Sequence, residues 1–379
     1  MVDAVRKPCL YESGERAFAS LGLGGLGDAK NIRVTSGINA PPQLEMEYPV
    51  TGRRFGDLQN RRIIYSTTGP DGKPQPFRIY RITKPLDGVC RVYARHIAHD
   101  LMGYSVRPFT AANPQAAAQM LTSGAVVENH EFTITAEISS SVAMTVATPR
   151  SIWSLLGGQR GSMLDVYGAG EWEFDHFTAR LKPRIGADNG ATVRYGVNLR
   201  TCEQDENLAN CWTAVQPYWY SQADDTLVVL PEETISTGTF DYVRILALDL
   251  TAEFETAPTV EQLRSRAKQY ISSNRVGVPA VGLDVDFVPL EQTAEYQDMP
   301  FLKSIRLGDS VTVDFPTAYD PESGRPTAMV QATARAVETV WLPLVGRYEK
   351  IRLGEKRANF VKEVAMQQKQ LAWVMTKVR

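Results

Sequence analysis

Residues 76–100, PFRIYRITKPLDGVCRVYARHIAHD, predict a β-hairpin and decide the class of the fold. Asp87-Gly88 forms the turn pair, because glycine tolerates the positive φ that a tight hairpin requires. After the turn, apolar and polar residues alternate at period two, so one face is suited to a core and the other presents cations and an aromatic ring. The core-side residues are Cys90, Val92, Ala94 and His96, and the opposite residues are Arg91, Tyr93 and Arg95.

Strand is also the dominant prediction for the rest of the chain. Residues 283–287 and 311–315 alternate cleanly between apolar and polar side chains, and the second run follows a turn at Gly308-Asp309. Residues 330–336 alternate in the same way, which indicates half-buried strands with one solvated or partner-facing side. Residues 242–250, YVRILALDL, are almost continuously apolar and predict either a strand buried on both faces or a short buried helix.

Three helices are predicted from the signals at their starts. Asn113-Pro114 offers an N-cap and a proline at the first helical position, and Thr148-Pro149 opens residues 150–156 in the same manner. In residues 259–273, Thr259 and Gln262 form a capping-box pair that precedes one apolar stripe at helical spacing.

Length and composition indicate a folded protein of several domains. The 379 residues exceed what one hydrophobic core fills, so two to four domains are expected. With 43% hydrophobic and 22% charged residues and a net charge of −2, the interspersed charges support neither a surface that coats nucleic acid nor a binder of anionic membranes. No apolar run approaches the ~20 residues that span a bilayer. The N-terminal residues contain no apolar secretory signal, so we expect synthesis in a cytoplasm.

The chain is predicted to be α+β, mainly β, and to have four parts. Residues 1–110 form a first β-rich domain, residues 111–275 a peripheral α+β domain that includes the bridging helix 259–273, and residues 276–354 a second β domain. Residues 355–379 form an amphipathic helix with apolar residues at near-helical spacing, namely Phe360, Val364, Leu371 and Met375. A helix this long is marginal in water unless its apolar side is covered. Either the body of the same chain or a sister chain would cover it, so these four residues are candidate oligomer contacts.

No catalytic, cofactor-binding or metal-binding residue is predicted. Residues 22–27 satisfy the G-x-G-x-x-G pattern, but a turn into a strand follows where a dinucleotide site needs a helix, which favours a connector. His96, His99 and Asp100 lie close together, yet His96 continues the core side of a strand and no third metal ligand is near in sequence. A hydrogen-bonded structural histidine is therefore expected.

A second histidine lies among carboxylates. His176 is close to Glu173 and Asp175, and paired carboxylates can cut a glycosidic bond only at a defined separation across a cleft. Alternating charged and aromatic residues along a strand explain the same sequence without a cleft. Cys90 lies within a predicted strand and is expected to behave as a small hydrophobe rather than a nucleophile.

The segment around residues 202–220 leaves two questions open. Cys202 and Cys211 lie nine residues apart in a polar stretch, and free thiols are favoured over a disulfide that later oxidation would form. Four aromatic residues cluster close behind, namely Trp212, Tyr218, Trp219 and Tyr220. They could stack on sugars, although core packing is the favoured interpretation.

Several short segments together resemble one family. PQPFRIYRI and VYARHIAHDL are similar to the N-terminal part of siphophage and prophage tail proteins known as prophage tail endopeptidase, tail-associated lysin or baseplate hub. The other segments follow in the family's order, namely GLGGLGDA, LEMEYPVTG, WSLLGG, GEWEFDHFTARL, RYGVNL, WTAVQPYWY, VVLPE, LGDSVTV and RYEKIRLG. The resemblance covers residues 10–355.

This resemblance implies a structural protein of the virion, made in the bacterial host. In such hubs, two barrel-like β domains per chain, in three copies, form a pseudo-hexameric ring at the tail tip, with a channel for the tape-measure protein and DNA. The implied partners are the homotrimer, the distal tail protein ring, the tape-measure protein, and receptor-binding or tail-fibre proteins, with no membrane-spanning segment and no cofactor. The alternatives are a cell-wall peptidase or hydrolase and a carbohydrate-binding receptor module.

Many relatives continue into a long C-terminal lytic or receptor-binding part, whereas this sequence stops soon after RYEKIRLG and the predicted helix. The enzymatic name of the family is therefore not transferred to this chain, and no enzyme activity is predicted.

Overall fold

The computed structural model describes residues 7–83, 87–207, 211–221, 225–254, 256–274, 276–277, 280–287, 304–323 and 325–354. The chain divides into two compact units. The first comprises Met1–Glu203 with Leu283–Arg379, and the second comprises Gln204–Gly282.

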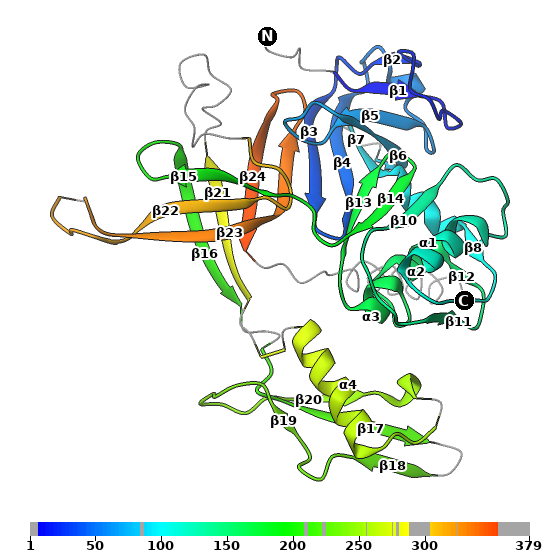
Figure 1. Ribbon diagram of the computed structural model, residues 1–379. Helices are drawn as coiled ribbons and strands as arrows, with labels where there is room; N and C mark the ends of the chain where they lie inside the picture. The colour runs from blue at the N-terminus through cyan, green and yellow to red at the C-terminus, as the bar shows by residue number, and fades with distance from the viewer. Residues whose placement is uncertain are drawn as a thin grey trace. The chain divides into compact units, whose positions relative to one another are not determined.

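The N-terminal half of unit 1 is an antiparallel sheet in the order β3-β4-β7-β6-β5-β1-β2 (Figure 1). Its elements are β1 (Cys9–Tyr11), β2 (Gly24–Gly25), β3 (Lys30–Gly37), β4 (Ala40–Pro49), a 3-10 turn (Phe55–Asp57), β5 (Ile63–Thr67), β6 (Pro74–Ile82) and β7 (Val89–His96). The hairpin predicted from residues 76–100 is confirmed as β6 and β7, and Gly88 adopts φ +79°. The predicted core side of β7 is buried. Three of its residues pack with Leu44, Met46 and Tyr48 of β4, while His96 is buried outside this cluster.

The second half of this sheet runs in the order β16-β21-β24-β23-β22-β15. Its strands are β15 (Asp188–Arg194), β16 (Leu199–Asn207), β21 (Ala280–Phe287), β22 (Ser310–Tyr319), β23 (Pro326–Leu342) and β24 (Arg347–Gly354). The three strands predicted at 283–287, 311–315 and 330–336 are confirmed within β21, β22 and β23. A core of small and branched residues fills this half, among them Val193, Val311, Val313, Ile351 and Leu353.

One strand joins the two halves. β23 is 17 residues long and pairs with β22 as far as Arg335, then with β24 from Ala336 and with β3 from Glu338 onward. Trp341 of β23 packs in the N-terminal core, where its indole N–H donates to Thr67 Oγ1 at 3.1 Å. Ala336 lies in the core of the other half, so a single strand contributes to both.

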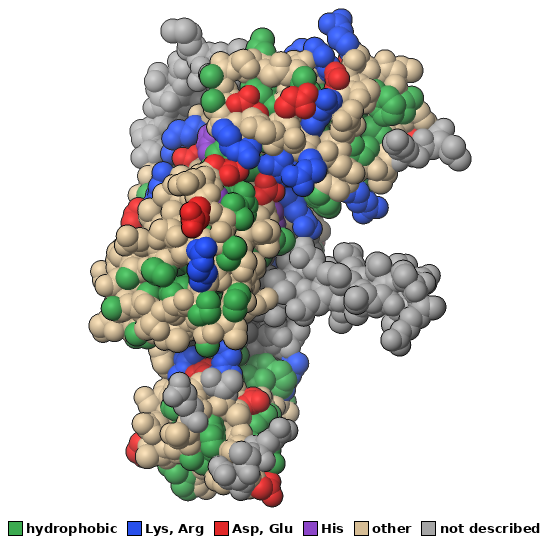
Figure 2. Space-filling view, turned by 90° about the vertical axis from the view of Figure 1, so that its right-hand side faces the viewer, with side chains coloured by type: hydrophobic (Ala, Val, Ile, Leu, Met, Phe, Trp, Pro, Cys, Tyr) green, Lys and Arg blue, Asp and Glu red, His purple; other side chains and the backbone are tan. Residues whose placement is uncertain are grey.

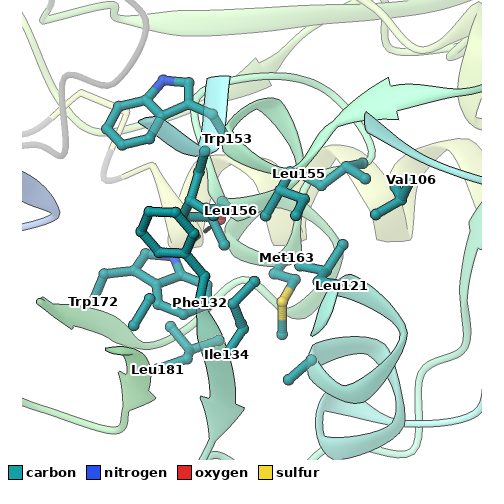
Figure 3. Close-up of a cluster of buried hydrophobic side chains, with 14 of the residues drawn as sticks. Val106, Leu121, Phe132, Ile134, Trp153, Leu155, Leu156, Met163, Trp172 and Leu181 are labelled. Atoms are coloured by element: carbon teal, nitrogen blue, oxygen red, sulfur yellow. Dashed lines mark hydrogen bonds between the residues drawn. The ribbon is translucent and has the colours of Figure 1, made fainter. Parts of the chain in front are cut away.

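A smaller α+β region lies between the two halves in sequence. Its elements are a 3-10 helix (Ile97–Gly103), β8 (Ser105–Val106), β9 (Phe109–Ala111), α1 (Pro114–Ser123), β10 (Thr133–Ala136), β11 (Met144–Val146), β12 (Arg150–Ser151), α2 (Ile152–Leu156), α3 (Met163–Tyr167), β13 (Glu171–Asp175) and β14 (Thr178–Lys182). Figure 3 shows its core, in which the buried Trp172 lies with Phe132, Ile134 and Leu181. The Trp172 indole N–H donates to the carbonyl of Leu156 at 3.0 Å, which satisfies its one polar atom.

Unit 2 is a sheet with one helix packed on it. Its elements are β17 (Ala214–Ser221), β18 (Thr226–Val229), β19 (Ile235–Ser236), β20 (Ile245–Asp249), a 3-10 turn (Thr251–Glu253) and α4 (Val260–Ser273). Leu263 and Ala267 of α4 are fully buried against Val215 and Trp219 of β17.

Two of the three predicted helix starts are confirmed. Asn113 caps α1 by accepting the Ala116 N–H at 2.8 Å, and both bonds of the Thr259–Gln262 capping box are present in α4. The start predicted at Thr148-Pro149 is wrong, because α2 begins at Ile152 and Ser151 is its N-cap. Residues 150–151 pair with β8 instead, so the helix starts only where the hydroxyl of Ser151 accepts the Ser154 N–H.

Of the two interpretations of residues 242–250, the strand is confirmed as β20, but its burial on both faces is wrong, and no helix forms there. β20 is a half-buried strand, in which Leu248 is 8% exposed and Ile245 is 45% exposed. α4 covers one face of the sheet, which explains the burial of Leu248 with Leu263. The continuous apolar run therefore does not correspond to burial on both faces.

The fold is α+β and mainly β, as predicted. Among the described residues neither half closes into a barrel, since β15 and β16 share only the bridge between Tyr195 and Leu199. The predicted helix 355–379, with Phe360, Val364, Leu371 and Met375, lies outside the described residues. Within the described part of the chain, no helix is long and apolar enough to cross a membrane.

Candidate interaction surface

The outward face of β3, β4, β6 and β7 carries aromatic and charged side chains in contact with one another. A β-bulge between Ile79 and Arg81 turns both Tyr80 and Arg81 outward opposite Tyr93. The Arg81 guanidinium lies 5.1 Å from the centre of the Tyr93 ring, and the Arg95 guanidinium lies 4.4 Å from that of Tyr80. Each such contact contributes about 0.5–1 kcal/mol at an exposed site, so the two stacks hold these guanidinium groups in place.

Ion pairs run along one side of the same face. Arg33 forms two hydrogen bonds to Glu349, of 2.7 and 2.9 Å, and these lower the pKa of that carboxyl. Glu47 accepts from Asn31 Nδ2 at 2.7 Å and lies 3.5 Å from Arg91. A depression of about 170 Å³ lies between these groups and is lined by Asn31, Arg33, Glu45, Met46, Glu47, Arg91 and Tyr93.

Three charges on this face have no ion-pair partner within 4.0 Å among the described residues, namely Glu45, Arg81 and Arg95. Together with the two rings they form a surface that we call the arginine–tyrosine surface (Glu45, Tyr80, Arg81, Tyr93 and Arg95). Because its charges are not neutralised internally, this surface is suited to a partner with a complementary pattern of both signs.

On the face drawn in Figure 2, cationic and anionic side chains lie interspersed. That face therefore gives no broad single-sign field, in agreement with the composition.

A second polar cluster is centred on Gln75, a residue that sequence reasoning missed. Gln75 Oε1 accepts from the backbone N–H of His176 at 2.8 Å and lies 3.1 Å from His96 Nε2. Gln75 Nε2 donates to Asp175 at 3.0 Å. His176 in turn bridges Asp175 at 2.8 Å and the Tyr65 hydroxyl at 2.9 Å.

This cluster is a structural joint. It ties β5, β6 and β7 to the turn between β13 and β14, and the ring of Phe18 stacks on Tyr65 with centres 4.6 Å apart. Burial alone would raise the pKa of Asp175, but the hydrogen bonds from Gln75 and His176 outweigh it and lower that pKa. Glu173 pairs with Lys182 and Arg180 rather than with Asp175, so the two carboxylates do not form an acid–base pair.

The suspected cluster of His96, His99 and Asp100 divides into three separate environments. His96 is fully buried, and burial lowers its pKa to about 3. Its Nδ1 accepts the Ala98 N–H, so its Nε2–H donates to Gln75. His99 stacks on Trp153 at 4.6 Å, and burial lowers its pKa well below the usual value. Asp100 pairs with Arg78 at 2.6 Å, although burial still raises its pKa. The prediction of a structural, hydrogen-bonded histidine is confirmed for His96.

The LGDSVTV segment lies where the second sheet half meets the α+β region of unit 1. Asp309 is buried and accepts from the backbone N–H of Ala187 at 2.8 Å and of Arg306 at 2.9 Å. Next to it, Arg335 of β23 forms two hydrogen bonds to Glu171 of β13, side chains that are 25% and 15% exposed. Residues 164 positions apart in sequence are thereby locked together.

The aromatic residues at 212–220 belong mainly to the core of unit 2. Trp219 is 6% exposed and donates its indole N–H to Phe254 O at 3.2 Å. Trp212 is partly buried, and Arg244 lies 4.5 Å above its ring. Core packing, the favoured interpretation, is confirmed for Trp219. Cys211 is a buried free thiol next to Gly277 O, whereas the side chain of Cys202 lies outside the described residues.

The remaining candidates lie in structural positions. Gly24 and Gly25 form β2, which pairs with β1, so part of the predicted connector is a paired strand, and β3 follows where a dinucleotide site needs a helix. Cys90 is a buried free thiol, as expected of a small hydrophobe. Within the described ranges, no group of three or more His, Cys, Asp and Glu residues could hold a metal ion.

Three solved structures are similar to this architecture. Prophage tail protein gp18 from Listeria monocytogenes EGD-e matches 97% of this chain and 100% of its own, with 14% identity and a TM-score of 0.53. The tail protein from Neisseria meningitidis MC58 matches 92% of this chain and 96% of its own, with 12% identity and a TM-score of 0.55. The chain has the fold of phage tail proteins. The 43 kDa tail protein of prophage MuSo2 from Shewanella oneidensis shares this tail-protein fold over 86% of the chain and 94% of its own, with 13% identity and a TM-score of 0.54.

No protein-family model matches the chain, and no curated protein matches it. The tail-protein fold agrees with the resemblance seen in the sequence. Membership of the tail endopeptidase and lysin family stays a prediction.

Proposed function

We propose that this protein is a structural component of a phage tail tip, the hub region of the tail endopeptidase and lysin family, and that three copies close a ring at the end of the tail tube. The observation that carries the proposal is the tail-protein fold over 86–97% of the chain. The organisation of unit 1 supports it, because two sheet halves share β23 and would act as one rigid piece. Two such halves in three copies give six similar segments, which suits a junction between a six-fold tube and a three-fold tip.

In this proposal, residues 1–110 supply one barrel-like tube domain, residues 276–354 together with β15 and β16 supply the other, and the rest of residues 111–275 supplies the peripheral domain. The ring anchors the receptor-binding or tail-fibre proteins, contacts the distal tail protein ring, and leaves a channel for the tape-measure protein and DNA. Cations in that channel would bind phosphates and slow DNA transit. We therefore expect that fewer than half of the ionisable residues facing the channel are Lys or Arg.

The test is an image of the particle combined with a solution mass. Cryo-electron microscopy of tails should place the chain as a ring at the distal end, and the purified ring should have three times the mass of the 42.0 kDa chain. If the chain is monomeric on its own, it is mixed with the distal tail protein and the mass of the complex is measured. A location elsewhere in the particle, or release of muropeptides from purified cell walls by this chain, would overturn the proposal.

The predicted terminal helix gives a second test. If sister chains cover residues 360–375, deleting residues 356–379 weakens the oligomer. If the helix folds back on its own chain, the deletion lowers only the stability of each copy. Measuring both oligomer mass and thermal unfolding separates these outcomes.

A further inference from the structure

β22 and β23 continue beyond their neighbouring strands as a two-stranded ribbon. β15 pairs with β22 only as far as Asp314, and β24 and β3 pair with β23 only from Ala336 onward. Among the described residues, Phe315–Tyr319 therefore pair only with Pro326–Val330. Figure 1 shows this ribbon projecting from the sheet as a long hairpin. We call residues 315–323 and 325–330 the arm. A two-stranded ribbon is only marginally stable alone in water, so the arm gains stability when a surface covers it.

The tip of the arm presents charges of both signs on a fixed turn. Asp320 Oδ1 accepts from the N–H groups of Glu322 and Ser323, at 2.9 and 2.7 Å, and from the Ser323 hydroxyl at 3.0 Å. These bonds lower the pKa of Asp320 and hold the turn. Glu322 and Arg325 are exposed, and neither has an ion-pair partner in the part of the chain that the structure describes. The tip thus offers a carboxylate and a guanidinium three positions apart in sequence, and neither is held in an ion pair within the described residues.

The arginine–tyrosine surface also carries both signs, two cations beside one carboxylate, so each charge of the tip can meet an opposite charge there. The arm cannot reach this surface in its own chain. Along β23, residue 328 lies ten positions from the start of the β3 ladder at Glu338, which is about 33 Å at the rise of a strand. The surface lies one to three strands beyond β3, on β4, β7 and β6, about 5–14 Å farther across the sheet. The complementary partner must therefore come from another molecule.

We propose that the arm of one copy of this chain docks on the arginine–tyrosine surface of a second copy, with Glu322 against Arg81 and Arg95 and with Arg325 against Glu45. The contact joins two different patches of the same chain, so it is heterologous and can repeat head to tail around a closed ring. This inference rests on the proposed ring and names the contact that would hold neighbouring copies together. The charge pairs of this contact set the register of the arm on the sheet, because backbone contacts alone would not distinguish one register from another.

The test exchanges charges across the proposed contact. Glu322→Arg and Arg81→Glu are made singly and together, as are Arg325→Glu and Glu45→Arg, with Glu137→Arg as an exposed control outside both patches. Association is measured by analytical ultracentrifugation at 50 mM and 500 mM salt, in the condition where the wild type assembles, and folding is checked by circular dichroism. Each single reversal is expected to weaken association about tenfold. The Arg325→Glu and Glu45→Arg pair should restore it to within about threefold of wild type, whereas the Glu322→Arg and Arg81→Glu pair should recover only part of the loss, because Arg95 then faces a cation. The effect should shrink at 500 mM salt because surface charges are then screened.

Each result bears on one of the two proposals. Folded single variants that associate like the wild type, or double variants that stay as weak as the singles, overturn the docking of the arm. A wild-type chain that forms no oligomer, alone or with the distal tail protein, instead overturns the ring. A control variant that weakens association as much as Glu322→Arg would show a general charge effect and would also overturn the specific contact.

Discussion

The buried histidine of β7 should make unit 1 sensitive to mild acid. His96 is fully buried, its nearest titratable neighbours are His176 and Asp175, and its pKa is about 3 in the folded protein against 6.5 ordinarily. Between these two values the unfolded chain binds a proton that the folded chain excludes. Stability is therefore complete above pH 6.5 and falls as the pH drops toward 3.

The size of this loss follows from the two pKa values. At 1.36 kcal/mol per pH unit, the full window from pH 6.5 to 3 corresponds to about 5 kcal/mol, and the step from pH 7 to pH 5 to about 2 kcal/mol. His99 is lowered in the same direction and adds to the loss in the wild type. A variant at His96 alone isolates the contribution of that one ring.

The variant is His96→Asn, since an asparagine oxygen can accept the Ala98 N–H that His96 Nδ1 accepts. Urea unfolding followed by hydrogen exchange of β6 and β7 peptides reports on unit 1 separately from unit 2. The variant should lose about 2 kcal/mol less than the wild type between pH 7 and pH 5. From pH 7 to 8, where the ring is neutral in both states, the two should differ by a constant amount. Equal losses in both proteins below pH 7 would refute a buried, neutral His96.

Three further changes test the packing. Glu171→Gln should cost about 2 kcal/mol of unfolding free energy because it breaks a half-buried pair, whereas Arg33→Ala at an exposed pair should cost at most about 1. Gly186→Ala should cost about 3 kcal/mol, since its Cβ would lie 2.1 Å from the Gly308 carbonyl carbon, while Gly190→Ala, with equally positive φ but open space, should cost about 1. Trp219→Ala should destabilise unit 2 by about 3–5 kcal/mol. Selective loss of glycan binding by a Trp219→Ala protein of wild-type stability would instead favour a receptor module.

Local signals were sufficient for the features that depend on neighbouring residues. The hairpin at 76–100 and the caps at Asn113 and Thr259 rest on turn chemistry and periodicity within a few positions. The prediction at Thr148-Pro149 was wrong because pairing of residues 150–151 with β8, a tertiary effect, delays the helix.

Features built from residues far apart in sequence left no local signal that could predict them. Gln75 joins three elements through ordinary amide hydrogen bonds, and nothing in its sequence context marks it. The bulge at Tyr80 and Arg81 arises from pairing with β7, and period-two alternation alone does not predict it. The arginine–tyrosine surface could be foreseen only in part, as the cation-bearing face of β7.

The position of β23 has a consequence for how the chain is made. β3 begins at Lys30 and pairs with β4 on one side, but its partner on the other side is a segment near residue 340. The first sheet half therefore cannot complete its hydrogen-bonded edge until almost all of the polypeptide has left the ribosome. Contacts of such sequence separation form slowly, and an uncovered edge can recruit the wrong strand meanwhile. Nascent chains of this protein thus spend most of translation with an open edge, which makes them natural clients of a chaperone.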